Sequence, residues 1–183
     1  MTQTTTTANT LGSMIAKLCE SGLGLGNAMA ADIDAAIFAS QPTGKDGQTI
    51  NTNHPAFNYG HLAIYPARVL EMCGLDAASA AAPAGYEDLF KAGVECRNDP
   101  SRTIYPKKDE IMAAYTKGYT ALIQQMPKVS DERLAAINPR EGRFRDMCPT
   151  IGHAAMFLAT SHIMMHLGQV STWRRCFGLK SVM

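Results

Sequence analysis

The chain has 183 residues, enough for one domain with a buried core. Its 17 lysines and arginines balance 16 aspartates and glutamates, which argues against the concentrated basic field that nucleic-acid binding requires. Five scattered cysteines, without a Cys-x-x-Cys pair, argue against a disulfide framework or a thiolate zinc site and fit a reducing cytoplasm.

The N-terminal segment has no basic region followed by an apolar stretch, which argues against a secretory signal. We expect residues 1–8 to form a flexible tail and residues 9–183 to form one helical domain. The first helix should begin near Thr10 and reach Phe38, either kinked or as two helices in series, because glycines weaken its middle. Its apolar residues recur at helical spacing, beginning with Leu11, Met14, Ile15 and Leu18.

The second predicted helix follows a turn-rich connector at residues 42–47. The asparagine or histidine before Pro55 should cap this helix, Pro55 should occupy its first position, and Gly74 should end it. Pro66 removes one backbone hydrogen bond and should bend it. Residues 75–106 then form a long connection with one short helical piece.

Two more long helices are predicted in the C-terminal half of the chain. The first spans residues 107–126 and ends at Pro127, and the second spans residues 149–177 and ends at Gly178. Residues 138–148 read as a polar loop, and no convincing strand pattern appears. Four long helices with long connectors predict an all-α protein, a four-helix bundle.

The stretch between Asp146 and Arg174 contains no charged residue and is long enough to cross a bilayer. It nevertheless contains a proline, three histidines and a glutamine, each of which is costly in lipid. A buried helix of a soluble protein is the better interpretation. Apolar residues all around this helix predict contacts on more than one side, within the bundle or across a dimer.

Two histidines in the last helix, His162 and His166, lie four residues apart, so both imidazoles leave the same helical face. A third, His61, lies in the apolar second helix. Each buried ring has a donor and an acceptor to satisfy, and a shared metal satisfies one nitrogen of each. Three histidine ligands with an open fourth position predict a reactive metal site rather than a structural one. The alternative is that each ring bonds to a neighbouring backbone group. Core positions on the same face are Ile151, Leu158, Met165, Gln169 and Trp173.

Three polar or aromatic side chains should lie close to this site. Gln169 lies one turn beyond His166, whereas Asn58 and Tyr65 flank His61 at positions minus three and plus four. Each is a candidate pocket residue, and for each the alternative is ordinary helix packing.

The remaining histidines are not expected to be ligands. His54 lies about 10 Å from His61 along the helix axis, which suits a cap or a pocket rim. His153 lies about 180° around the helix from His162, so it should be a core or interface residue. Three imidazoles suit zinc or nickel, and iron or copper also accept them.

Two separated segments of the chain carry a family resemblance. Residues 58–63 read Asn-Tyr-Gly-His-Leu-Ala, and residues 162–169 read His-Ile-Met-Met-His-Leu-Gly-Gln, followed by Trp173-Arg174-Arg175. The chain resembles the DinB/YfiT-like family of metalloenzymes, whose members typically show Gly-His-Leu in the first place and His-x-x-x-His-x-Gly-Gln in the second. The order and the wide separation of the two segments are also similar.

The resemblance implies a four-helix bundle with up-down-down-up topology. It implies a divalent metal on His61, His162 and His166, with water in the open positions, and it implies frequent homodimers. Characterised relatives include thiol-dependent S-transferases and a mycothiol-dependent maleylpyruvate isomerase.

The leading hypothesis is therefore a divalent-metal-dependent enzyme, with a low-molecular-weight-thiol S-transferase ahead of a hydrolase because no general base is evident beside the histidines. A second hypothesis is a non-catalytic helical dimer that binds a small apolar ligand. A third is a metal sensor or store. No interaction with nucleic acid or membrane is expected.

Overall fold

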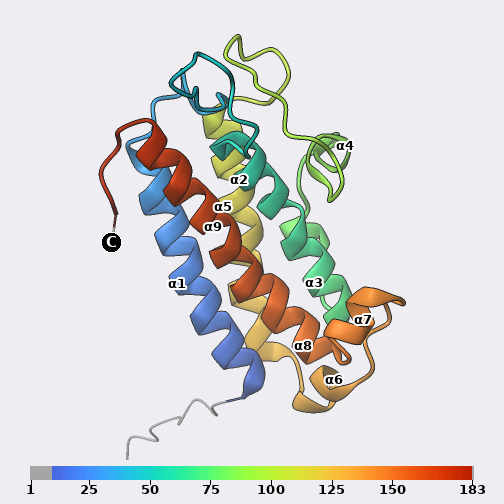
Figure 1. Cartoon of the computed structure of the whole chain (residues 1–183). Coiled ribbons are helices and arrows are strands. Elements are labelled where there is room, and N and C mark those ends of the chain that lie inside the picture. Colours follow the sequence, from blue (N-terminus) through green and yellow to red (C-terminus); the bar gives the residue numbers. More distant parts are fainter. Residues whose placement is uncertain (1–9, 183) are drawn as a thin grey trace, which may run out of the picture.

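The computed structural model describes residues 10–182, and within this range the protein is all-helical, as predicted (Figure 1). The described residues form no β-strand, and only two isolated bridges occur, Thr43–Thr49 and Ile137–Thr150. The predicted N-terminal tail, residues 1–8, lies outside the described residues.

Helix α1 spans Leu11–Ala31, and the Thr10 side chain caps it by accepting a hydrogen bond from the Ser13 amide at 3.2 Å. The prediction that helical structure continues to Phe38 is wrong. The chain turns after Ala31, and the Asp34 carboxylate accepts the Ala36 amide at 2.8 Å, a bond typical of turns. Phe38 is nevertheless buried, so the apolar spacing beyond residue 31 reflects core packing of a turn segment.

The prediction of one bent helix across residues 55–73 is confirmed. Helix α2 spans Pro55–Ala63 and α3 spans Tyr65–Cys73, with the break at Ile64, two residues ahead of Pro66. His54 caps α2, because its Nδ1 accepts the Phe57 amide at 3.1 Å. Gly74 ends α3 with a φ of 74°, a backbone conformation that favours glycine.

The long connection to the next helix contains the 3₁₀ turn η1, Ala78–Ala80, and the short helix α4, Tyr86–Phe90. Helix α5 then spans Lys108–Gln125 and passes into the 3₁₀ turn η2, Met126–Lys128. These bounds agree with the prediction that Pro127 ends this helix.

The C-terminal region begins with α6, Asp131–Ala135, and α7, Arg143–Met147. Because α7 is helical, the interpretation of residues 138–148 as loop alone is wrong. The last long helix consists of α8, Ile151–Met156, the π-helix η3, Phe157–Ser161, and α9, His162–Cys176.

Not every predicted core residue is buried. Met165 of α9 is about half exposed, so its assignment to the core is wrong, and Met14 and Leu18 of the apolar spacing in α1 are exposed to a similar degree. The buried face of α9 turns instead toward Ile163, Leu167 and Val170.

The long helices run alongside one another, with α5 in contact with α1, α2 and α3, and α9 in contact with α1 and α2 (Figure 1). Aromatic and aliphatic side chains fill the space between them, the largest being Trp173, Tyr59, Tyr115, Tyr119, Phe38 and Phe90. Within residues 10–182, no helix is long and apolar enough to cross a membrane.

Close packing at Gly60 of α2 and open space at Gly24 of α1 predict opposite effects for two glycine-to-alanine substitutions. A Cβ at Gly60 would lie 2.5–2.6 Å from three ring atoms of Phe90, so Gly60→Ala should destabilise the fold by about 1–3 kcal/mol. A Cβ at Gly24 of α1 meets nothing within 4 Å, so Gly24→Ala should stabilise by about 0.5–1 kcal/mol. Urea unfolding monitored by circular dichroism measures both, and equal stabilisation by the two substitutions would contradict the packing argument.

Candidate metal centre

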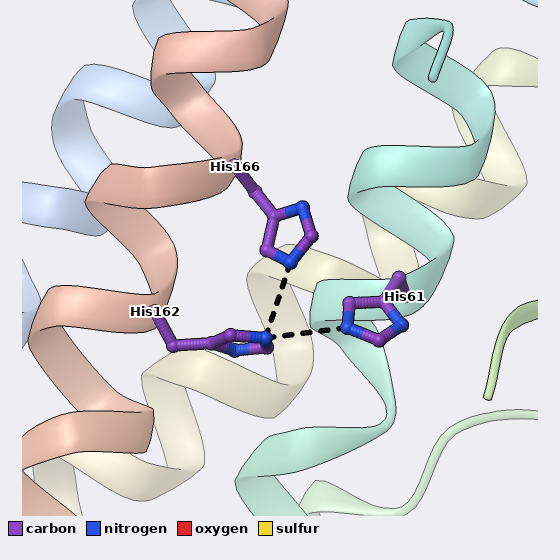
Figure 2. Close-up of side chains that lie close together, drawn as sticks. All are labelled: His61, His162 and His166. Carbon is purple, nitrogen blue, oxygen red and sulfur yellow. Dashed lines mark hydrogen bonds between the residues drawn. The ribbon is translucent and has the colours of Figure 1, made fainter. Parts of the chain in front are cut away.

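Three buried histidines from two distant segments converge between α2 and α9, as predicted. His61 comes from α2, whereas His162 and His166 come from the first turns of α9 (Figure 2). The Nε2 atom of His162 lies 3.2 Å from Nε2 of His61 and 3.1 Å from Nε2 of His166. Each residue is only 5–6% exposed. These three residues, which we call the histidine triad, could hold a metal ion.

Two of the three nitrogen separations fit a shared tetrahedral ion, and all three nitrogens lie within 4.8 Å of one another. Zinc–nitrogen bonds of about 2.0–2.1 Å in tetrahedral geometry place two ligand nitrogens about 3.3 Å apart. The two separations at His162, 3.2 and 3.1 Å, are close to this value. Imidazole donors alone do not select among divalent transition metals.

Hydrogen bonds at Nδ1, the ring nitrogen that points away from the centre of the triad, set the tautomers of two of the histidines. The Nδ1–H of His61 donates to the Phe90 carbonyl at 2.6 Å. The Nδ1–H of His166 donates to Asn58 Oδ1 at 2.9 Å and to Gln169 Oε1 at 3.2 Å. A neutral imidazole carries one proton, so both Nε2 atoms present a lone pair to the centre of the triad. This is the protonation pattern of metal-ligating histidine.

His162 differs from the other two members of the triad. Its buried Nδ1 has no hydrogen-bond partner among the described residues, and aromatic rings hold it in place. The Tyr65 ring lies edge-on at 4.4 Å between centroids, and the Phe157 ring lies at 5.9 Å. Its Nε2–H can therefore bridge the lone pairs of the other two rings when no ion is bound.

Burial keeps the triad neutral. Desolvation is the largest cause that lowers the pKa of each ring, to about 3 for His162 and to about 4 for His166, with a shift in the same direction for His61. Repulsion by neighbouring histidines adds to the lowering for His162 and His166. Metal binding requires unprotonated imidazole, so this environment favours it.

The predicted pocket residues all lie against the triad. Tyr65 packs on both His61 and His162, with ring centroids 4.9 and 4.4 Å away. Asn58 and Gln169 contact His166, and their amide oxygens are its hydrogen-bond acceptors. They therefore orient a ring, a role that differs from the open pocket expected of them.

The predictions for the remaining histidines have different outcomes. The expectation that His54 caps α2 is confirmed, and its other ring nitrogen lies 3.0 Å from the Arg97 carbonyl. His153 is exposed, so its assignment to the core is wrong, whereas its alternative assignment to an interface stays a prediction. Its Nδ1 lies 2.8 Å from the hydroxyl of Thr150, the residue that caps α8, and this contact keeps the ring at the surface.

Several contributors to the site were not identified from the sequence. The Phe90 carbonyl belongs to α4, far along the chain, and no motif marks it. Asn53 supports the triad indirectly, because its Nδ2 donates to Gln169 Oε1 and its carbonyl accepts from Asn58 Nδ2, both at 3.2 Å. Its position two residues before Pro55 suggested only a helix cap.

Comparison with protein-family models, curated proteins and solved structures finds no match for this chain.

The buried histidines predict a loss of stability in acid. Because their pKa values are lower in the folded state than the usual 6.5, the unfolded chain binds more protons below that pH. In metal-free protein, the free energy of unfolding should therefore fall as the pH drops from about 6.5 to about 4, by at most about 1.4 kcal/mol per pH unit for each ring. Urea unfolding in EDTA across this range measures the slope.

One histidine outside the triad provides the matched variant. His54→Asn keeps a capping side chain but removes a buried ring whose pKa is lowered to about 4, so its pH slope should be shallower than that of the wild type. His153→Asn alters an exposed ring and should follow the wild-type slope. A wild-type free energy that stays flat over this pH range would contradict the burial argument.

The acceptor role of Asn58 predicts an effect on metal affinity. Asn58→Leu removes the oxygen that fixes the His166 tautomer, so zinc affinity should fall by about 10–100-fold. Asn138→Leu is the matched control, because this asparagine is equally buried and hydrogen-bonded but bonds only to residues 140, 148 and 149 and not to the triad. Competition with a chelating dye measures both affinities, and an equal loss in the two variants would refute the positioning role.

Proposed function

We propose that this chain is a divalent-metal-dependent enzyme of the DinB/YfiT-like kind, with zinc or nickel held by His61, His162 and His166. The observation that carries the proposal is the convergence of three neutral Nε2 atoms at separations of 3.1 and 3.2 Å in a buried site. A site built only for stability would use four protein ligands, and the described residues offer three.

The proposal includes a four-helix bundle with up-down-down-up topology. Contacts between helix ends support it. The start of α1 at Gly12 lies against Met126, beyond the end of α5, and Lys108 at the start of α5 donates to the Ile33 carbonyl after α1, so these helices are antiparallel. Arg174 near the end of α9 donates to the Met29 carbonyl near the end of α1, so α9 runs parallel to α1. Helix α2 begins at the end where α1 finishes, since the Ala56 amide donates to the Phe38 carbonyl (Figure 1).

The reaction that we favour joins a low-molecular-weight thiol through its sulfur to a small electrophile, with loss of the thiol proton and formation of a carbon–sulfur bond. A divalent ion on the triad would favour the thiolate, which is the nucleophilic form of the thiol. The chain's own residues hold the three imidazoles in one protonation pattern, and the rings of Tyr65 and Phe157 keep the site apolar. No carboxylate contacts the triad among the described residues, so the general base that a hydrolase needs is not evident.

We also propose that the chain forms a homodimer. Large apolar side chains are exposed on the neighbouring helices α1 and α9, where Met14, Leu18, Met164 and Met165 are each about half exposed. Exposed apolar side chains on neighbouring helices favour association.

Metal content tests the proposal most directly. Protein purified without a histidine tag should contain close to one equivalent of zinc or nickel, and added metal should raise the melting temperature. His162→Ala should lose most of this metal because its Nε2 contacts both other members of the triad, whereas His153→Ala should retain it. Less than about a tenth of an equivalent, with no thermal response to either metal, would refute a metal-dependent function.

Activity with the metal-loaded protein then separates an enzyme from a metal store. Bacillithiol, mycothiol and glutathione, each with a model electrophile, should include at least one substrate pair whose turnover is lost in His162→Ala and kept in His153→Ala. Full metal occupancy without turnover of any pair would favour the sensor or store.

A further inference from the structure

A cavity of about 420 Å³ lies at the N-terminal end of α5, away from the histidine triad. It lies between the turn segment after α1 and the loop that leads into α5. We infer that this cavity binds a small organic anion with an apolar body, such as an aromatic carboxylate. The inference does not depend on the proposed function of the metal centre.

The inner wall of the cavity is apolar and rigid. Its buried rings belong to Phe38 and Tyr105. Phe38 stacks on Tyr59 at 6.0 Å between centroids, and the Tyr105 hydroxyl accepts the Arg97 amide at 2.9 Å. The Tyr105 ring also stacks with Phe90 at 5.6 Å. Both rings are therefore held in place, and a flat apolar group can pack on them without a prior rearrangement.

The outer wall is a loop that a buried carboxylate fixes in place. Asp99 is 2% exposed, and its two oxygens accept the amides of three successive residues, 103–105, at 2.9–3.1 Å. The Asp99 amide in turn donates to the Ala39 carbonyl at 2.9 Å. This arrangement holds Arg102 at a φ of 58°, the one positive value for a non-glycine residue among those described. The Asp99 charge is thus already satisfied within its own loop.

The rim of the cavity is positively charged. Arg102, Lys107 and Lys108 line it against a single acid, Asp109, which leaves a formal charge of +2. The 18-residue helix α5 begins at this rim, and its dipole adds to the positive potential. Lys108 lies 5.8 Å from the Phe38 ring, so the cationic and apolar parts of the cavity adjoin.

These two surfaces define the chemistry of the ligand. A ring or short apolar chain would pack against Phe38 and Tyr105, and a carboxylate, sulfonate or phosphate would face the cations at the rim. A neutral molecule of the same shape lacks the second contact, and an inorganic anion lacks the first. Two rings, Tyr105 and Phe57, separate the cavity from His61, so its occupant would not reach the triad.

The experiment titrates 4-fluorobenzoate into the ¹⁵N-labelled, metal-free full-length chain and follows both ¹⁹F and amide resonances. Binding should saturate below about 10 mM and should perturb amides of residues 101–109 together with Phe38. The neutral analogue 4-fluorobenzamide should bind at least about fivefold more weakly than 4-fluorobenzoate. Absence of binding up to that concentration, equal affinity for the two probes, or shifts confined to the triad would each overturn the inference.

Two variants test the two surfaces separately. Arg102→Asn removes a charge but keeps a residue that tolerates positive φ, so the chain should fold and 4-fluorobenzoate affinity should fall about fivefold. Ala35→Phe places a ring in the mouth of the cavity at an exposed position and should abolish binding. Arg143→Asn, on α7, removes the same charge outside the cavity and should leave affinity unchanged. Wild-type affinity in both Arg102→Asn and Ala35→Phe would overturn the inference.

Discussion

The contact between α2 and α9 depends on how three neutral imidazoles share one small buried space. His61 and His166 both direct Nε2 lone pairs toward the centre, because their Nδ1 protons are committed to the Phe90 carbonyl and to two side-chain amides. Two lone pairs facing each other in an apolar interior repel unless a proton or a cation lies between them. His162 can supply the proton from its Nε2, and a divalent ion can replace it.

The π-helix η3 explains how the last long helix serves two different contacts. A π turn adds about one residue per turn and so rotates the preceding segment by about 100° relative to the following one. Helix α8 therefore buries Ile151, Ala154 and Ala155, while α9 begins directly with His162 facing α2. The same rotation accounts for the exposure of Met165. In an uninterrupted helix Met165 would share the buried face of Ile151, but the π turn moves it away from that face.

Local patterns predicted much of this structure, and non-local contacts account for what they missed. Caps, prolines and Gly74 carry their information within one turn, so the start of α2, the end of α3 and the end of α5 could be read from the sequence. The spacing of His162 and His166 likewise needs only helix geometry. The end of α1 was misjudged because a packed turn segment has the same apolar spacing as a helix. The Phe90 carbonyl could not be predicted, because any backbone carbonyl can accept from His61.

The partnerless Nδ1 of His162 does not by itself distinguish a metal site from a polar core cluster. With a proton on Nε2, the Nδ1 lone pair lacks a donor; with an ion at Nε2, the Nδ1 proton lacks an acceptor. Either state leaves one unsatisfied atom, so the cost of about 1–3 kcal/mol is the same in both. In both states the hydrogen bonds at Nδ1 of His61 and His166 hold their Nε2 atoms unprotonated, so these atoms can accept either the His162 proton or a cation. Their lowered pKa values mean that near neutral pH an incoming cation displaces no charge from these rings, so protons do not oppose its binding.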